Sequence, residues 1–355
     1  MEWGVFNLEE LFGKSTRGKR LKSEDRISGT LPFVTAGEKD EGISAFIGND
    51  VTVFSENTIT IDMFGSAKYR NYKYGCDDHI AVVHTQKLPK PVAIFITSAI
   101  HKKSYTGEFH YGRNFYAKDA DTLNISLPTN NGKIDFEFME SFIAELEAER
   151  IAELEAYLLA TGLKDYTLTD EEKQVLDDFE KGKIAFGRFT YQSIFNKIVQ
   201  GRRLKKDDQI SGNIPFVMAG TTNTGVVNYI SNPVASFPKN SITVDIFGNT
   251  FYRNYYFGAG DDTGVYWNDE REYSKEVMLF FATSMEKSIS GKFDFGKKLR
   301  SSQSLNLTMK LPTQNNQPNY AIMETFISAI QKLVIKEVVL YADRKIAATK
   351  TVVNK

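Results

Sequence analysis

Carboxylates are the residues whose types and spacing could do chemistry in this 355-residue chain. The acids concerned are Asp62 and Asp77-Asp78 in the first half, and Asp245 and Asp261-Asp262 in the second. Grouped acids could hold Mg²⁺ for nuclease work. A structural role would explain these acids as well, because a carboxylate beside Arg70 or Arg253 can pair with the guanidinium or cap a turn. We predict a chain without its own catalysis, with a metal-dependent nuclease as the alternative.

Two other motifs do not complete a site. Gly13-Lys14-Ser15 resembles the end of a phosphate-binding loop, but the glycine required five positions earlier is Leu8. All four histidines (His79, His84, His101 and His110) lie in the first half, and no nearby cysteine completes a metal set around His79 and His84. The chain has neither an Asn-Pro-Pro-Tyr element for base methylation nor a glycine-rich adenosylmethionine loop. We therefore predict no metal and no cofactor in this chain.

The chain is built twice. Residues 18–37 return as residues 201–220, with 13 of 20 positions identical. Residues 59–65 return as 242–248, and Leu-Pro-Thr at 127–129 returns at 311–313. The repeat is far longer than the 20 to 50 residues of a solenoid unit, so each copy can bury its own core. Two related but diverged lobes suit a target that also has two parts.

Composition and charge restrict the class of protein. With 41% hydrophobic and 25% charged residues the chain is globular, and the single Cys76 excludes an internal disulfide. No apolar run approaches a membrane span, and the acidic, amphipathic start is unlike a signal peptide, so we expect a cytoplasmic protein. Residues 135–181 hold 15 acidic and 4 basic residues, which leaves 40 basic and 30 acidic residues elsewhere. That excess favours a polyanionic partner, although ordinary solvated surfaces would also explain it.

Each copy is predicted to be a mixed, mostly β lobe followed by a long helix. Strand-like runs occupy residues 51–54, 58–61, 92–96, 241–246 and 277–281. Apolar residues then return every three or four positions over residues 135–160 and from residue 320 to about 348, and two such stripes would pack as an antiparallel pair. Residues 169–172 read as the capping box of a short acidic helix. The expected segments are 1–133 (lobe), 134–163 (helix), 164–182 (acidic connector), 183–317 (lobe) and 318–350 (helix).

A helix over residues 135–160 would span about 39 Å, or roughly one turn of duplex DNA. Two lobes held by such a spacer could touch one face of a duplex at two sites a turn apart.

In the order of its motifs the chain resembles the specificity subunits of type I restriction-modification systems (the HsdS family) and the shorter type IIB subunits. The residues that carry the resemblance are Leu31-Pro32-Phe33-Val34, Ile214-Pro215-Phe216-Val217, the blocks 62–70 and 245–253, and the two Leu-Pro-Thr elements. The resemblance implies an α+β fold with two homologous mixed α/β target recognition domains, joined by two long antiparallel helices. It also implies that each domain reads half of a split, asymmetric DNA site, and that the chain itself is not an enzyme.

The resemblance implies partners as well. They are double-stranded DNA and a DNA methyltransferase subunit with or without a fused or separate nuclease, and S-adenosylmethionine and Mg²⁺ would belong to those subunits. AELEA occurs at residues 144–148 and 152–156, which resembles the tandem repeats that act as a ruler in the family; a generic Glu-rich helix face is the alternative. A two-lobed protein-binding scaffold is a further alternative for the whole chain.

Candidate DNA contacts fall in basic and polar loops. Phosphate contacts are expected from Arg17, Lys19, Arg20, Lys22, Arg202, Arg203, Lys205 and Lys206. Base contacts are expected in loops that differ between the lobes: Thr35, Lys39, Lys68, Lys102, Lys103 and Arg113 in the first, and Thr221, Asn223, Asn249, Lys287, Lys297, Lys298 and Arg300 in the second. Arg70 and Arg253 recur in both lobes, so they suit a phosphate contact or the scaffold better than a base contact. Solvated basic loops remain the alternative.

Overall fold

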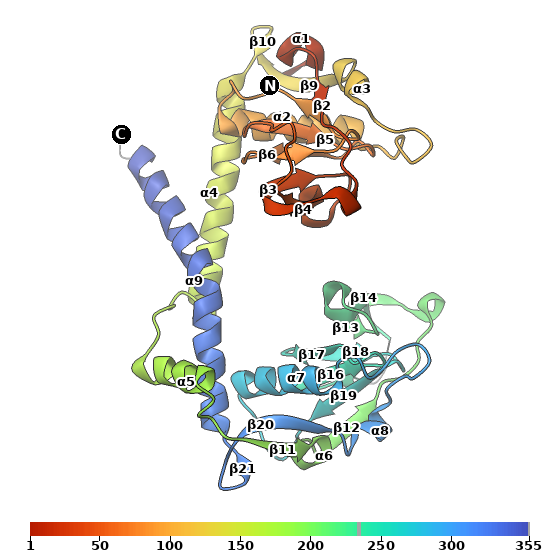
Figure 1. Cartoon of the computed structure of the whole chain (residues 1–355), viewed down its shortest axis with the longest axis vertical. Coiled ribbons are helices and arrows are strands. Elements are labelled where there is room, and N and C mark those ends of the chain that lie inside the picture. Colours follow the sequence, from red (N-terminus) through yellow and green to blue (C-terminus); the bar gives the residue numbers. More distant parts are fainter. Residues whose placement is uncertain (233–235, 354–355) are drawn as a thin grey trace. The chain divides into compact units, whose positions relative to one another are not determined.

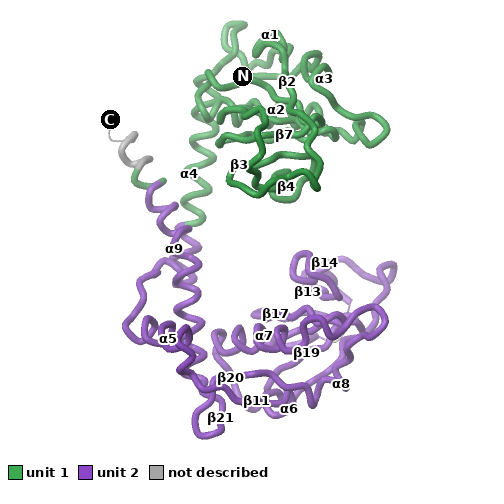
Figure 2. The backbone as a smooth tube through the Cα atoms, in the orientation of Figure 1, with its two compact units in different colours: residues 1–154, 345–355 green, residues 155–344 purple. Residues whose placement is uncertain are grey.

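The computed structural model describes residues 1–232 and 236–353 (Figure 1), with side chains up to residue 347 at the C-terminal end. The chain divides into two compact units (Figure 2): Met1–Leu154 with Lys345–Lys355, and Glu155–Arg344. Each unit contains one copy of the repeat and mixes helices with small sheets, so the predicted α+β class is confirmed. The division falls inside the long helices, and the five segments predicted from the sequence stay a prediction.

Three small sheets form the lobe of unit 1. With neighbouring strands named in turn, they are β1 (Glu2–Asn7), β9 (Asn124–Asn130) and β10 (Lys133–Ile134); β2 (Thr16–Arg17), β8 (Ala81–Val83), β5 (Thr58–Ile61) and β6 (Ala67–Arg70); and β4 (Ile43–Ile47), β3 (Ser28–Val34) and β7 (Gly75–Cys76). The helices are α1 (Leu8–Phe12), α2 (Lys90–Ser104) and α3 (Ala117–Asp121), with short turns η1 (Ser23–Asp25) and η2 (Lys39–Gly42).

Unit 2 repeats this arrangement. Its sheets are β11 (Phe186–Thr190), β20 (Thr308–Gln314) and β21 (Gln317–Pro318); β12 (Lys197–Gln200), β19 (Thr263–Trp267), β16 (Ser241–Asp245) and β17 (Thr250–Arg253); and β14 (Val226–Ile230), β13 (Ser211–Val217), β18 (Phe257–Ala259) and β15 (Ser236–Phe237). Its helices are α5 (Asp170–Glu180), α6 (Tyr191–Ile194), α7 (Lys275–Ile289) and α8 (Ser301–Ser304), with turns η3 (Lys206–Asp208) and η4 (Thr222–Gly225).

The strand register corrects one detail of the sequence alignment. Ile59 lies opposite Val83 in unit 1, and Ile242 lies opposite Tyr266 in unit 2. The offset of 183 therefore holds through this strand, so Asp78 corresponds to Asp261 and Asp77 corresponds to Gly260. The two acid pairs, which an alignment by residue type would match as Asp77-Asp78 with Asp261-Asp262, are therefore shifted by one residue relative to each other.

Three of the five predicted strands are wrong. Residues 92–96 and 277–281 lie in α2 and α7, where Val92, Ala93, Ile96 and Ile100 show the spacing of a buried helix face. A short apolar run cannot distinguish a buried strand from a buried helix, and in this fold the helix packs across the sheets. Residues 51–53 are not in a strand, and only Phe54 forms an isolated bridge, with Tyr74. The strands predicted at 58–61 and 241–246 are present as β5 and β16.

The long helices are α4 (Phe136–Ala160) and α9 (Tyr320–Val353). Within unit 2, Lys164 contacts both Glu155 and Asp343, and within unit 1 Lys345 lies 3.2 Å from Glu147, so the two helices contact each other in an antiparallel sense. The capping box is confirmed: Thr169 Oγ1 accepts from the Glu172 N–H at 3.2 Å, and Glu172 Oε2 accepts from the Thr169 N–H at 2.8 Å. Among the described residues no helix has the length and apolar character of a membrane span.

Candidate nucleic-acid interface

A buried aspartate organises each lobe. Asp245 is 4% exposed, and its Oδ1 accepts the backbone N–H groups of Phe247 (2.8 Å) and Asn249 (3.0 Å). Its Oδ2 accepts from the Gly220 N–H (3.0 Å) and from Asn249 Nδ2 (2.7 Å). The carboxylate therefore closes the turn after β16 and holds the loop at residue 220 against it.

Asp62 does the same in unit 1. Its Oδ1 accepts the N–H groups of Phe64 and Ser66, both at 3.0 Å, and its Oδ2 accepts from the Gly37 N–H at 3.2 Å. The interpretation of these acids as turn caps is confirmed. Because each oxygen is turned onto backbone donors of its own lobe, the geometry gives them a structural role and not that of a metal ligand.

Arg253 is buried in unit 2, with 1% of its surface exposed. Its Nε donates to Thr243 Oγ1 (3.0 Å), one Nη donates to the Tyr255 hydroxyl (3.0 Å), and the other donates to the carbonyl oxygen of Thr224. Burial lowers the pKa of this guanidinium from its ordinary value, although an arginine stays protonated. Arg253 cannot reach DNA, and its assignment as a contact is corrected.

Arg70 is the counterpart in unit 1 and is also 1% exposed. It donates to Thr60 Oγ1 (2.9 Å), the Tyr72 hydroxyl (2.9 Å) and the Glu41 carbonyl (2.8 Å). Its assignment as a DNA contact is corrected for the same reason. Neither arginine forms an ion pair with the turn-capping aspartate, although the sequence allowed one. Each guanidinium group donates instead to a backbone carbonyl in a loop of its own lobe.

The loops that these arginines hold are residues 35–42 and 218–225, which we call the braced loops. Each contains two consecutive residues other than glycine in the left-handed region: Asp40 and Glu41 (φ 49° and 54°), and Asn223 and Thr224 (φ 49° and 52°). Such residues cost about 1 to 3 kcal/mol each and persist only where the surroundings fix them. The buried arginine and the turn-capping aspartate supply that fixation. The braced loops are therefore rigid, and their tips are exposed.

The braced loops differ in the chemistry they display. In unit 1 the exposed tip carries Glu38, Lys39, Asp40 and Glu41, whereas in unit 2 it carries residues 221–224, which are threonines and one asparagine. Thr35 is half-buried behind the first tip. Charged groups and neutral hydroxyl or amide groups recognise different base edges. The same backbone thus presents two different sets of donors and acceptors.

The basic loops are exposed as the sequence predicts. The exposed cations are Arg17, Lys19, Arg20 and Lys22 in unit 1, and Arg202, Arg203, Lys205 and Lys206 in unit 2. Each loop contains a glycine at which the backbone packs too closely for a side chain. A Cβ on Gly201, for example, would lie 2.2 Å from the Gly260 carbonyl oxygen. In unit 2 the loop lines a cavity of about 600 Å³ together with Met218, Asn228 and Asp261. In unit 2 the basic loop and the braced loop therefore adjoin one surface.

Other predicted contacts lie elsewhere or are engaged inside the lobe. Lys102 and Lys103 stand in the last turn of α2, and Lys287 in that of α7, so they are helical and not loop residues. Lys68 Nζ is bonded to Ser66 Oγ (2.8 Å) and Glu38 Oε1 (3.2 Å), and Asn249 is bonded to Asp245, so both side chains support the loops. Arg300, by contrast, donates to the Asp261 carbonyl and stands beside the basic loop.

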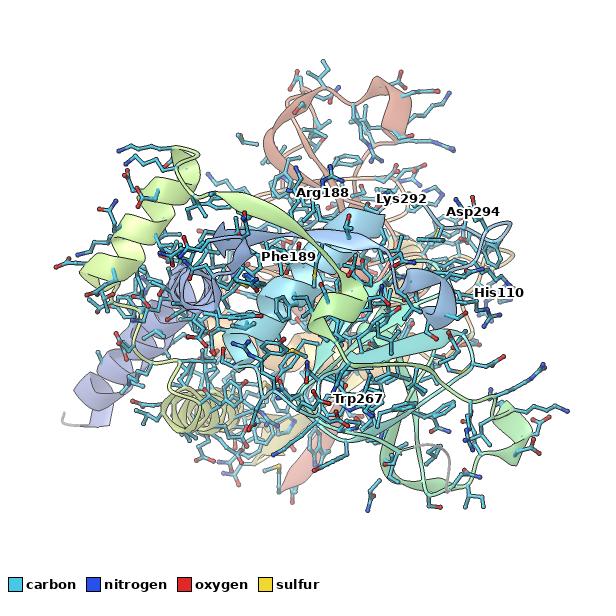
Figure 3. The ribbon with its side chains drawn as sticks, turned by 90° about the horizontal axis from the view of Figure 1, so that it is seen from below. His110, Arg188, Phe189, Trp267, Lys292 and Asp294 are labelled. Carbon is cyan, nitrogen blue, oxygen red and sulfur yellow. The ribbon has the colours of Figure 1, made fainter. Side chains whose placement is uncertain are left out.

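A second basic surface was missed by sequence reasoning. Arg188, Lys292 and Lys310 line a polar pocket of about 320 Å³ with Lys287, between α7, β11 and β20. Figure 3 labels Arg188 and Lys292 on this side of the unit. These cations come from separate elements, so no local run of charge revealed them. Among the described residues, none of the four makes an ion pair.

One cluster in unit 1 has the residue types of a metal site. Ligand atoms of Asp77, Asp78 and His79 lie within 4.8 Å of one another, and all three residues are half-buried. His79 Nδ1 lies 3.0 Å from Asp78 Oδ1, while His84 is bonded to Thr16 Oγ1, so the two histidines do not form one site. Unit 2 has Gly260, Asp261 and Asp262 at the equivalent positions, so the cluster is not part of the repeated design.

Comparison with known families identifies this design. The model of the family described as "Type I restriction modification DNA specificity domain" matches residues 1–156 and 186–340. The chain belongs to this family. The resemblance read from the sequence is thereby confirmed. As a member of the specificity family, the chain is a DNA-recognition subunit of a restriction-modification system and is not catalytic, and nothing favours the nuclease alternative.

Individual relatives agree with the assignment. The specificity subunit is 22% identical over 351 residues to the "Type II restriction enzyme BgcI specificity subunit S.BcgI" of Heyndrickxia coagulans, which covers 94% of this chain and 96% of the relative. Its fold is similar to that in the "Crystal structure of Type-I restriction-modification system S subunit from M. genitalium", with a TM-score of 0.58 and 14% identity, covering 99% of this chain and 94% of the other.

Proposed function

We propose that the chain selects a split, asymmetric DNA site and brings a methyltransferase subunit to it, with or without a nuclease. One observation carries this proposal. A turn-capping aspartate, a buried arginine, a braced loop and an exposed basic loop are built twice, and the two braced loops display different side chains. Two rigid loops with the same backbone conformation and different side chains suit the recognition of two different half-sites. S-adenosylmethionine and Mg²⁺ would act in the partner subunits, in the cytoplasm.

A two-lobed scaffold that binds only proteins is the competing function. The excess of basic residues outside residues 135–181 favours DNA, because duplex DNA attracts cations from any sequence. A gel shift with duplex of mixed sequence separates the two functions, since a scaffold of that kind leaves the duplex unshifted.

Removing two cations of the basic loop should weaken binding to every DNA sequence. In Arg202→Ala/Arg203→Ala, the slope of log K against log salt should flatten by about 1.8, because each phosphate contact contributes about 0.9. The measurement is fluorescence anisotropy of a labelled duplex over a salt series. The matched control is Arg188→Ala/Lys310→Ala, which removes the same charge from the second basic surface and should change the slope by less than half as much. An unchanged slope in the first variant, or a larger change in the control, would indicate that the DNA lies on the second basic surface and not on the basic loop.

Lengthening the spacer helices should change the preferred gap between the half-sites. Four residues inserted after Ala148 in α4, matched by four in α9, add about 6 Å and should lengthen the gap by one to two base pairs. Selection of bound duplexes from a pool with randomised gap length measures this. Replacing the exposed Glu145 and Glu149 by Gln without an insertion is the control, and it should leave the gap unchanged. A gap that does not respond to the insertion would remove the helices from the role of ruler.

A further inference from the structure

A tight turn with an outward aromatic ring stands at the same place in both lobes. In unit 1, His110 and Arg113 exchange both backbone hydrogen bonds, at 3.0 and 2.8 Å. In unit 2, Asp294 and Lys297 do the same at 3.1 and 3.2 Å. Figure 3 labels His110 and Asp294, the first residues of the two turns. We call residues 110–113 and 294–297 the aromatic turns.

The first residue of each aromatic turn fixes its shape a second time. His110 Nδ1 accepts the N–H of Gly112 at 3.1 Å, and Asp294 Oδ1 accepts the N–H of Gly296 at 2.7 Å. Different side chains thus make the same bond. A turn closed by three hydrogen bonds has few alternative conformations, so the residue at its tip is held in place.

The tip residues are Tyr111 and Phe295, and both are 84% exposed. The aromatic residue two positions earlier faces inward in each copy: Phe109 packs edge-on against Phe115 at 4.9 Å, and Phe293 packs against the core of unit 2. A single exposed ring is ordinary. Two rings kept largely exposed at equivalent positions of diverged lobes, while the aromatic residues two positions earlier face inward, indicate a use at the surface.

A cation stands at the last position of each aromatic turn and lies over the inward ring that precedes the turn. The Arg113 guanidinium lies 5.3 Å from the centre of the Phe109 ring, and Lys297 Nζ lies 5.7 Å from that of Phe293. Stacking on a ring holds the cation beside the turn without neutralising it. Arg113 also contacts Glu108 at 3.0 Å, but both side chains are about 60% exposed, so solvent screens this pair.

The aromatic turns are joined to the braced loops. Tyr111 packs edge-on against Phe64 (5.3 Å between ring centres), and Phe295 packs against Phe247 (5.0 Å). Phe64 and Phe247 belong to the turns closed by the buried aspartates, whose other oxygens hold the braced loops. Each ring therefore packs against the turn that holds the braced loop of its own lobe in place.

We propose that Tyr111 and Phe295 are DNA contacts that place their rings against bases of the duplex, with Arg113 and Lys297 on the adjacent phosphates. This inference rests on the proposed function. A cation in the same turn as each exposed ring favours a polyanion over a protein surface, and aromatic side chains that enter a groove stack on bases or wedge between them. The phenol of Tyr111 adds a hydrogen-bonding group that Phe295 lacks, so the two lobes accept different base steps.

Alanine at the tip tests the proposal through a difference between two kinds of variant. Phe295→Ala should weaken binding to a duplex of about 40 base pairs by roughly 5- to 100-fold, the loss of one stacked base, with the salt slope unchanged because the ring is neutral. Lys297→Ala should flatten the slope by about 0.9. Tyr111→Ala and Arg113→Ala should behave in the same two ways. The control is Tyr256→Ala, which removes another exposed ring, 62% exposed, from unit 2 and should leave affinity within twofold.

A fluorescent ring distinguishes DNA from a protein partner. Phe295→Trp is made in a chain whose own tryptophans, Trp3 and Trp267, are replaced by Phe. Addition of the duplex should quench the new tryptophan, and a subsequent addition of the partner methyltransferase should not be required for quenching. Quenching by the partner alone would assign the ring to a protein interface and overturn the inference, as would a Phe295→Ala variant no weaker than the control. An unsubstituted chain that fails to bind any duplex would overturn both this inference and the proposed function.

Discussion

Replacing Asp245 by Ala should destabilise unit 2 by about 4 kcal/mol, because four donors lose a charged acceptor at once and bonds to charged groups contribute about 1.5 to 3 kcal/mol each. The four are the backbone N–H groups of Phe247, Asn249 and Gly220, and the Asn249 amide. Some of them are partly accessible to water, which keeps the total below the sum of the separate bonds. The same substitution should release the braced loop at Gly220 from the turn after β16.

Urea unfolding of a Trp3→Phe chain measures this effect in unit 2. Trp267 then reports alone, and it packs against Phe237 within the same unit at 6.1 Å. Asp261→Ala is the matched control, because it removes the same charge from a half-exposed side chain and should cost less than about 0.5 kcal/mol. Asp245→Asn should lie between the two, since the amide keeps one acceptor and turns a donor towards Gly220. Equal midpoints for Asp245→Ala and Asp261→Ala would show that the buried carboxylate does not hold the turn.

Arg253→Met should destabilise unit 2 by about 3 kcal/mol. Methionine fills the space of the aliphatic stem, but Thr243 Oγ1, the Tyr255 hydroxyl and the Thr224 carbonyl lose their donor inside the lobe, at about 1 to 3 kcal/mol for each group left unsatisfied. The loss is also local. Without the guanidinium, fewer hydrogen bonds hold Asn223 and Thr224 in the left-handed region, so the braced loop should relax.

Two measurements check this prediction together. Urea unfolding gives the free energy, and amide hydrogen exchange over residues 221–225 should quicken more than exchange in β16. Arg203→Met makes the same chemical change at an exposed position of unit 2 and should alter neither. Arg253→Lys keeps the charge but not the planar fork, so it should retain less than half of the stabilisation. If Arg253→Met exchanges no faster than the unsubstituted chain at residues 221–225, the loop is fixed by something other than the arginine.

Much of this protein follows from local patterns in the chain. The duplication, the helices over residues 136–160 and from 320 onward, the capping box at Thr169 and the two exposed basic loops were all predicted, since each depends on residues close together in sequence. Where a pattern is ambiguous locally, prediction failed. The apolar runs at 92–96 and 277–281 fit a buried strand as well as a buried helix, and only packing across the sheets decides between them.

The candidate site shows the same limit more sharply. From the sequence, Arg70 and Arg253 were plausible phosphate contacts, and Asp62 and Asp245 plausible partners for them or for a metal. Only the tertiary structure shows that each arginine is buried and reaches a loop 29 residues away in sequence, while each aspartate caps the turn and ties down the same loop.

The sequence by itself therefore determined the architecture and the class of function, because repeats, helix periodicity and charge are properties of neighbouring residues. The tertiary structure decided which polar side chains face solvent and which hold loops in strained conformations. The reason is physical: a side chain's exposure and its hydrogen-bond partners depend on what the fold packs around it, and distant segments supply those neighbours. The outward rings of Tyr111 and Phe295, beside the inward Phe109 and Phe293, became visible only at that level.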